Sequence, residues 1–328
     1  MKSKSFRFAF FILLCIIVLL SWSLYMQSTS SWHLFKDNWF MTVVMVFGSF
    51  IAGASSEGGG AIAYPAMTLL FNIEPDVARN FSFAIQSLGM TFATIWIVLS
   101  GIKIEKTYLL IGAIGGLIGI ITGTLFIIPH VLPAYAKMMF VSFWLSFGIA
   151  LWVVNFINHR DSKSRLPSLN AYQKGELFAV AIIGGVFSSI LGNGLDICTF
   201  SYVVMKYRLS EKIATPTSVI LMASNAIVGF VMHSTVFNTM QAEAYSYWLV
   251  CIPVVIFGAP AGAYIVNKIG RKTIAALLIA IIAVQFITAI FIIRPGLSLS
   301  LFSLGIFCTG ILLFFVISRP QKIISQVP

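Results

Sequence analysis

Charged residues are scarce in this sequence. Asp, Glu, Lys and Arg make up 9% of its 328 residues, whereas about a quarter is usual in a soluble globular domain. Hydrophobic residues account for 59% of the chain. This composition excludes an ordinary soluble domain and favours a membrane protein.

Cysteine and histidine are also rare, and neither shows a ligand pattern. The four cysteines (Cys15, Cys198, Cys251 and Cys308) stand singly in apolar segments, so their spacing indicates neither a zinc site nor a disulfide framework. The histidines lack metal-ligand spacing, and no GxSxG, HExxH or Walker A motif is present. We therefore expect no metal, no cofactor and no catalytic residue.

Long apolar runs occupy most of the chain. Runs of about 18 or more residues, each long enough to cross a bilayer as a helix, lie at 8–26, 81–101, 107–128, 135–157, 213–234, 247–267, 273–293 and 297–318. Because lipid offers no partner for backbone N–H and C=O groups, these runs must be helices. The sequence predicts an all-α polytopic membrane protein, in which the first run is a retained helix because no small-residue cleavage pattern follows it.

The basic residues predict an orientation. With the amino terminus in the cytoplasm, the outer side keeps only Lys36, Arg79, Lys137 and Arg294 of the 21 Lys and Arg residues, as the positive-inside rule expects. The net charge of +11 then reflects orientation and contact with anionic membrane lipids, and we expect no nucleic-acid partner. We predict a multi-pass protein of the bacterial cytoplasmic (inner) membrane with both termini cytoplasmic.

Two segments, 40–71 and 176–207, share one pattern. Each is an apolar stretch interrupted by glycines and one acid, in SSEGGG at 55–60 and GNGLD at 192–196. A constant shift of 136 residues superposes Gly48 on Gly184 and Ser82 on Ser218. We expect each segment to form a broken helical hairpin whose arms are too short to cross the membrane comfortably.

The repeated pattern divides the chain into five regions. These are a first helix and outer loop (1–39), a first repeat (40–157), a cytoplasmic linker (158–175), a second repeat (176–293) and a final helix with a tail (294–328). Each repeat holds a broken hairpin and three transmembrane helices. Because the first helix precedes the first repeat, the two repeats would enter from opposite sides, an inverted-topology arrangement associated with alternating access.

A second correspondence supports the duplication. The stretches GIITG at 119–123 and GAPAG at 258–262 match with a shift of 139 residues. Both carry small residues four positions apart, a spacing that lets helix backbones approach closely.

The glycine tips are candidate substrate contacts, because paired glycine-interrupted segments in two halves point to a transporter binding site. A helix that begins inside the membrane also exposes N–H groups that suit an anion. We therefore predict ligand contacts at Gly58, Gly59, Gly60, Asn193 and Gly194. The alternative is that these glycines only permit a tight turn or close packing.

Polar side chains open the span that follows each tip. Asn80, Ser82 and Gln86 in the first half and Thr217 and Ser218 in the second are neutral groups that suit an oxyanion, and we predict that they bind substrate. They would otherwise hold helices together. Arg79 is expected to form a loop ion pair or to attract anions rather than to contact substrate.

Glu57 and Asp196 are the two carboxylates predicted within the hydrocarbon region. A charge there costs at least ~2.5 kcal/mol, so such residues are functional candidates. We predict that they take up and release protons during transport, the alternative being that each caps the following half-helix. An intramembrane enzyme would need a nucleophile–base pair, of which Cys198 near Asp196 is a poor example.

The stretch ASSEGGGAIAYP at 54–65 resembles the sulfite exporter TauE/SafE family, whose members carry a glycine-rich tract ending in proline within a duplicated unit. The resemblance covers 40–293. The second tract departs from this pattern, because Ser201 stands where Pro65 would map. The resemblance implies export or uptake of small sulfur-containing anions, such as sulfite, sulfoacetate or related organosulfonates.

These features together predict a secondary transporter that moves a small anion by alternating access, with a passive anion channel as the alternative. Its expected partners are the anionic solute, membrane lipids and, as a candidate coupling ion, the proton. Substrate, direction of transport and oligomeric state stay open.

Overall fold

The computed structural model describes residues 4–56, 58–157 and 161–318. These residues form α-helices and no strand: α1 (Lys4–Ser28), α2 (Leu34–Ala54), α3 (Gly60–Pro65), α4 (Pro75–Ser100), α5 (Lys106–Thr122), α6 (Pro133–Trp152), α7 (Ala171–Leu191), α8 (Leu195–Tyr207), α9 (Glu211–Val231), α10 (Ala242–Lys268), α11 (Arg271–Ile293) and α12 (Leu297–Ser318). Single π-helical turns extend α3 (η2, Ala66–Leu70), α5 (η3, Gly123–Ile127), α6 (η5, Val153–Ile157) and α9 (η6, Met232–Val236). Short 3₁₀ turns precede α2 (η1, Ser31–His33) and α6 (η4, Ile128–His130).

Ten helices of the described part are long and apolar enough to cross a membrane. The prediction of an all-α polytopic membrane protein is therefore confirmed. All eight apolar runs belong to these spans, and the two additional spans contain α2 and α7.

The expectation that both arms of each hairpin are too short is wrong for the first arms. Helices α2 and α7 have 21 residues each, or about 30 Å at 1.5 Å per residue, which matches the hydrocarbon thickness. The second arms are short: α3 has six residues, its extension η2 has five, and α8 has 13. Each break therefore lies between a full-length helix and a short one.

Helices α2 and α10 pack backbone to backbone through glycines. A methyl group added at Gly53 would collide with the carbonyl oxygen of Ala259, and one at Gly262 would collide with that of Phe50. Removing the side chain at such positions lets two helix axes approach closely. The predicted role of the GAPAG stretch is thereby confirmed.

Helices α5 and α7 meet in the same way. A methyl group at Gly123 would lie 3.0 Å from Cα of Val186, and one at Gly119 would collide with the carbonyl oxygen of Ile182. Gly123 and Val186 correspond to Gly262 and Phe50 under the shifts of 139 and 136 residues. The first long helix of each half thus packs on the GxxxG helix of the other half.

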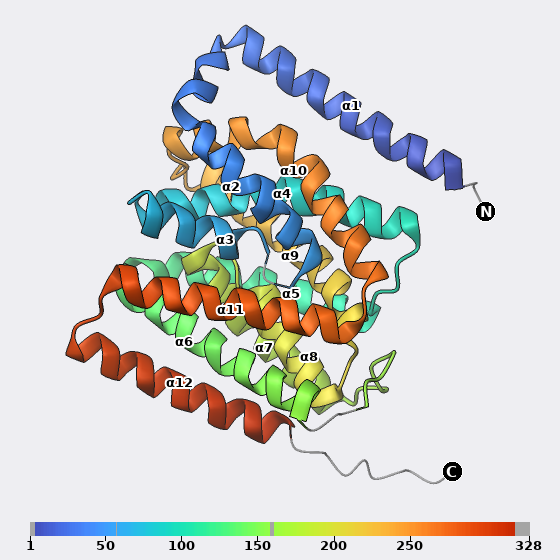
Figure 1. The fold of residues 1–328 in the computed structure, drawn as a ribbon, viewed down its shortest axis with the longest axis vertical. Coiled ribbons are helices and arrows are strands. Elements are labelled where there is room, and N and C mark those ends of the chain that lie inside the picture. Colours follow the sequence, from blue (N-terminus) through green and yellow to red (C-terminus); the bar gives the residue numbers. More distant parts are fainter. Residues whose placement is uncertain (1–3, 57, 158–160, 319–328) are drawn as a thin grey trace.

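The terminal helices lie at opposite edges of the bundle. Figure 1 shows α1 along one edge and α12 along the other, with α2, α3, α4 and α10 on the side of α1 and α6 and α11 on the side of α12. Only 11% of the α1 window and 17% of the α12 window are buried inside the protein. Their apolar surfaces are therefore available to lipid.

The two ends of the bundle differ in charge. One end, here called the basic end, carries loops 101–105, 161–170, 208–210 and 269–270, and α1 begins and α12 ends toward this side (Figure 1). The other, here called the charge-poor end, carries loops 29–33, 71–74, 131–132, 237–241 and 294–296. Hydrogen bonds join neighbouring loops at the basic end, such as Leu166 N to Glu105 Oε2 and Lys163 N to Arg208 O.

Candidate functional site

The two glycine breaks meet inside the bundle. Gly58 has a φ of +69° in the first break, and Gly192 and Gly194 have φ values of +79° and +143° in the second. A methyl group added at Gly58 would lie 3.1 Å from Oδ2 of Asp196. The absence of a side chain at Gly58 therefore brings the backbone of one break against the acid of the other.

Gln86 of α4 connects both breaks. Its Nε2 atom donates to the carbonyl oxygens of Ser82 and Gly192, both at 2.9 Å. Its buried Oε1 has no hydrogen-bond partner within the described part of the chain and would collide with a methyl group at Gly58. Gln86 thus holds the second break with its amide nitrogen while its oxygen faces the first.

Asp196 is fully buried in the first turn of α8. Its Oδ1 accepts a hydrogen bond from the backbone N–H of Gly194 at 3.2 Å, and Oδ2 has no partner among the residues that the structure describes. The N–H of Leu195 donates to Ser188 Oγ at 2.9 Å. Two N–H groups at this tip are therefore already used within the protein, and one carboxylate oxygen remains aimed at Gly58. The other predicted proton-coupling residue, Glu57, lies outside the described residues.

The remaining predicted tip glycines lie beside this contact. Gly59 immediately precedes α3 and Gly60 begins it, and the N–H of Ala63 donates to the carbonyl oxygen of Gly59 at 2.9 Å. A methyl group at Gly59 would find ordinary contacts, 3.5 Å from Cβ of Ala52 and from Cγ of Gln86.

The predicted polar residues of α4 lie on the charge-poor side of the breaks. Asn80 donates through Nδ2 to Thr239 O and to Gln241 Oε1, both at 2.9 Å, and so holds loop 237–241. Ser82 donates to Ala78 O at 2.7 Å and touches the second break: a methyl group at Gly192 would lie 2.6 Å from its Cβ.

The predicted polar residues of α9 lie toward the basic end. Thr217 accepts a hydrogen bond from the N–H of Glu105 at 2.9 Å, which ties α9 to loop 101–105. Ser218 donates to Thr215 O at 2.8 Å. The structure thus brings Ser82 and Gln86 to the breaks, whereas Asn80 and Thr217 bind loops at opposite ends of the bundle.

Arg79 forms the expected ion pair. Its Nη1 lies 3.0 Å from Oδ1 of Asp76, and its Nε donates to Oδ1 of Asn80 at 3.2 Å. The Arg79 side chain is 6% exposed and that of Asp76 is 65% exposed, so the pair sits at the rim of the charge-poor end.

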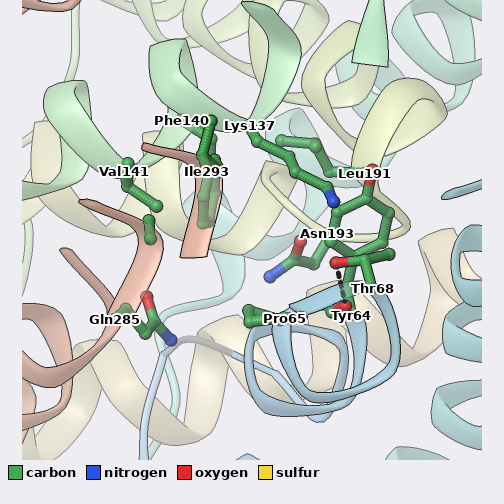
Figure 2. Close-up of a pocket in the computed structure, with 11 residues that line it drawn as sticks. Tyr64, Pro65, Thr68, Lys137, Phe140, Val141, Leu191, Asn193, Gln285 and Ile293 are labelled. Atoms are coloured by element: carbon green, nitrogen blue, oxygen red, sulfur yellow. Dashed lines mark hydrogen bonds between the residues drawn. The ribbon is translucent and has the colours of Figure 1, made fainter. Parts of the chain in front are cut away.

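A small pocket lies between the breaks and the charge-poor end (Figure 2). Asn193 of the second break points into it, together with side chains from the short arm of the first hairpin and from α6 and α11. The lining residues are Tyr64, Pro65, Thr68, Lys137, Phe140, Val141, Leu191, Asn193, Gln285, Ala289 and Ile293. Its interior of about 20 Å³ accommodates about one water molecule.

Lys137 is the pocket residue that the sequence analysis missed as a candidate. The positive-inside count placed it among the outer charges, but its ammonium group projects inward over the pocket (Figure 2), 5.8 Å from the ring centroid of Tyr64. The signal in the sequence was a lone lysine at the start of a long apolar helix, a position that suits a lysine reaching for the interface equally well.

Comparison with protein families gives one match. The family model described as "Sulfite exporter TauE/SafE" matches residues 41–289, which is more than half of the chain and contains both hairpins. Comparisons with curated proteins and with solved structures found no match. The chain therefore belongs to the sulfite exporter TauE/SafE family, whose members are membrane transporters of sulfite or related anions.

Proposed function

We propose that this protein is a secondary transporter of the bacterial cytoplasmic membrane that moves a sulfur oxyanion or organosulfonate, such as sulfite or sulfoacetate, by alternating access. The observation that carries the proposal is the meeting of the two glycine breaks, with Gly58 against Asp196 and Gln86. Broken helices that meet inside the membrane at the junction of two repeats form the binding sites of many secondary transporters.

The packing around the breaks argues against a permanently open channel. The pocket beside Asn193 has an interior of about 20 Å³, and the one beside Gly59 about 10 Å³. Neither is large enough to conduct a hydrated anion, so an anion can pass only if the helices around the breaks move. Such a requirement is the basis of alternating access.

The reciprocal helix pairing supports an origin of the site in two repeats of inverted topology. Helix α2 packs on α10 while α7 packs on α5, and α4 packs on α9 between them. This pattern is unchanged when the helices of the two halves are exchanged. We infer that the breaks are equivalent elements of 40–157 and 176–293.

Asp196 is the described candidate for proton coupling. It is buried at the contact between the breaks, and one of its carboxylate oxygens has no partner in 4–56, 58–157 and 161–318. An ionisable residue in that position is a functional candidate, and proton uptake there would remove a negative charge next to a passing anion.

Flux in proteoliposomes tests the proposal, with Gly58→Ala and Gly59→Ala as matched variants. Alanine at position 58 would adopt an unfavourable φ of +69° and collide with Gln86 Oε1, whereas position 59 has room for a methyl group. We expect wild-type protein and Gly59→Ala to move sulfite and Gly58→Ala to lose most of this flux while eluting as folded protein.

An imposed proton gradient completes the test. A proton-coupled transporter would accumulate sulfite beyond its own electrochemical equilibrium, and a channel would not. Unchanged flux in Gly58→Ala would remove the breaks from the mechanism, and a wild-type protein that moves no sulfur anion would overturn the proposed function.

A further inference from the structure

We propose that Lys137 is the cationic group that binds the transported anion in the pocket between the breaks and the charge-poor end, once movement of the surrounding helices has enlarged this pocket beyond the single water molecule that it accommodates here. This inference rests on the proposed function and names a binding residue for it. Lys137 reaches the pocket from the first turns of α6, and Asn193 reaches it from the second break (Figure 2). An anion held by Lys137 would therefore lie next to the element expected to move.

Lys137 differs from the paired cations of the bundle. Arg79 pairs with Asp76 and Lys206 with Glu176, but no carboxylate among the described residues lies within ion-pair distance of the Lys137 ammonium group. A half-buried lysine in a membrane-spanning helix carries a high free-energy cost, and such residues mark substrate or ion pathways. A transported anion would supply the missing negative charge.

The direction of the Lys137 side chain distinguishes a binding role from a lysine that only extends toward the membrane interface. A lysine near a helix end usually extends its ammonium group to the membrane surface. Lys137 instead turns toward the pocket, where its ammonium group lies 5.8 Å from the Tyr64 ring centroid (Figure 2). A cation over an aromatic face is partly stabilised by the ring, which keeps it available for an anion.

The rest of the pocket suggests which anions fit. Thr68 and Asn193 offer neutral polar groups, whereas Phe140, Val141 and Ile293 form an apolar wall. A single ammonium group balances one negative charge, and Lys137 is the one cation among the described residues that line the pocket. We infer a preference for monovalent oxyanions, such as hydrogensulfite or a simple alkanesulfonate, over dianions such as sulfoacetate, because the second charge of a dianion would be desolvated without a partner. This preference narrows the range of anions named in the proposed function.

The test compares Lys137→Met, Lys137→Arg and Lys36→Met in purified full-length protein. Lys36 is exposed near the start of α2, at the same end of the bundle, so its removal changes the local field without touching the pocket. Methanesulfonate serves as the monovalent probe and sulfate as the divalent one, and binding is measured by calorimetry.

We expect the wild-type protein to bind methanesulfonate at least about tenfold more tightly than sulfate. Lys137→Met should weaken methanesulfonate binding by at least about tenfold, while Lys137→Arg and Lys36→Met should stay within about threefold of wild type. A tenfold change corresponds to about 1.4 kcal/mol. Unchanged binding in Lys137→Met, or an equal loss in Lys36→Met, would overturn the assignment.

If the Lys137→Met variant fails to fold, a measurement on the wild-type protein tests the assignment instead. Methanesulfonate should slow acylation of the Lys137 amine, read by mass spectrometry, and should leave Lys36 unaffected. Equal rates with and without the anion contradict the proposal. If the wild-type protein transports sulfite and Lys137→Met transports it with unchanged KM, this inference fails and the proposed function stands; if the wild-type protein transports no sulfur anion, the proposed function itself fails.

Discussion

At the scale of single residues, Gly192 combines two requirements that favour glycine. Its φ of +79° lies in the left-handed region, and a methyl group there would lie 2.6 Å from Cβ of Ser82 and 2.9 Å from the carbonyl oxygen of Arg79. Gly101 has a similar φ of +66°, but open space surrounds its missing side chain. Comparing substitutions at Gly192 and Gly101 therefore distinguishes the effect of backbone strain from the effect of crowding at the break.

Alanine at each position should give different results. Both variants adopt a left-handed conformation that costs about 1–2 kcal/mol for a residue with a side chain, but only Gly192→Ala also pushes α4 away from the second break. We expect Gly101→Ala to keep sulfite flux near the wild-type value and Gly192→Ala to lower it at least about tenfold. Equal flux in both variants would indicate that the contact with α4 is not needed.

The sequence indicated part of the site because a polar residue in an apolar span is conspicuous. Gln86 and Asp196 were predicted in this way and Asn193 as part of the second glycine tip, and these residues lie at the breaks or at the adjoining pocket. Lys137 was missed because a lysine near a helix end can either reach toward the membrane interface or point into the protein. Only the direction of the side chain distinguishes these two possibilities. Asn80 is different again: its bonds to loop 237–241 depend on tertiary contacts that spacing does not reveal.

At the scale of helices, glycine-mediated packing makes a prediction about stability. Gly119, Gly262 and Gly305 all lie inside helices, where alanine is intrinsically favoured over glycine by about 1 kcal/mol. A methyl group at Gly119 or Gly262 would collide with the backbone of a partner helix, whereas a methyl group at Gly305 would have no described atom within 4 Å. A glycine-to-alanine substitution should therefore have opposite effects on the free energy of unfolding at Gly305 and at Gly119 or Gly262.

We expect Gly305→Ala to leave the free energy of unfolding unchanged or to raise it slightly. Gly119→Ala and Gly262→Ala should lower it by about 1–3 kcal/mol, the usual cost of overpacking. Reversible unfolding in mixed detergent measures the three values. A stabilised Gly262→Ala variant would show that α2 and α10 can separate at little cost.

The helix boundaries show what hydropathy alone leaves out. The first hairpin was predicted to begin at 40, but α2 begins at Leu34, includes Lys36 and Asp37 and kinks at Asn38. Charged residues are tolerated in the terminal turns of a span, where they reach the interface. In α7 the start was visible in principle: Asn170 and Gln173 form a capping box, a pattern readable from sequence.

At the scale of the whole molecule, the two sides of the breaks are unlike. Tyr64 lines the pocket on the charge-poor side. Its equivalent under the shift of 136 residues, Phe200, is buried in the core, with its ring centroid 6.1 Å from that of Phe147. The ring of Phe314 in α12 also packs on that of Phe147, and their centroids are 5.5 Å apart. We therefore expect the pocket side to open more readily than the side that the aromatic cluster fills.

Cysteine labelling tests this asymmetry with Thr68→Cys and its equivalent Val204→Cys. Thr68 lines the pocket, whereas Val204 lies in the core cluster. A membrane-impermeant thiol reagent should modify Thr68→Cys at least about tenfold faster than Val204→Cys, and sulfite should slow the reaction. The wild-type protein, with Cys15, Cys198 and Cys251 buried and Cys308 exposed, gives the background. Equal rates at both positions would show that the two sides are equally accessible.

The glycine contacts between α2 and α10 and between α5 and α7 also bear on how the molecule can deform. Each tightly joined pair takes one helix from the amino-terminal half and one from the carboxy-terminal half, so a cut through the linker at 158–175 would not yield two self-contained pieces. Each fragment would expose a groove shaped for a helix of the other. The order of helices along the gene and the division of the protein into mechanical parts are therefore different things. Helix α8 is clamped as well, because a methyl group at Gly184 of α7 would lie 2.8 Å from Cα of Leu195. Among the described residues, α3 is the short arm without such a backbone contact and is the element left to shift.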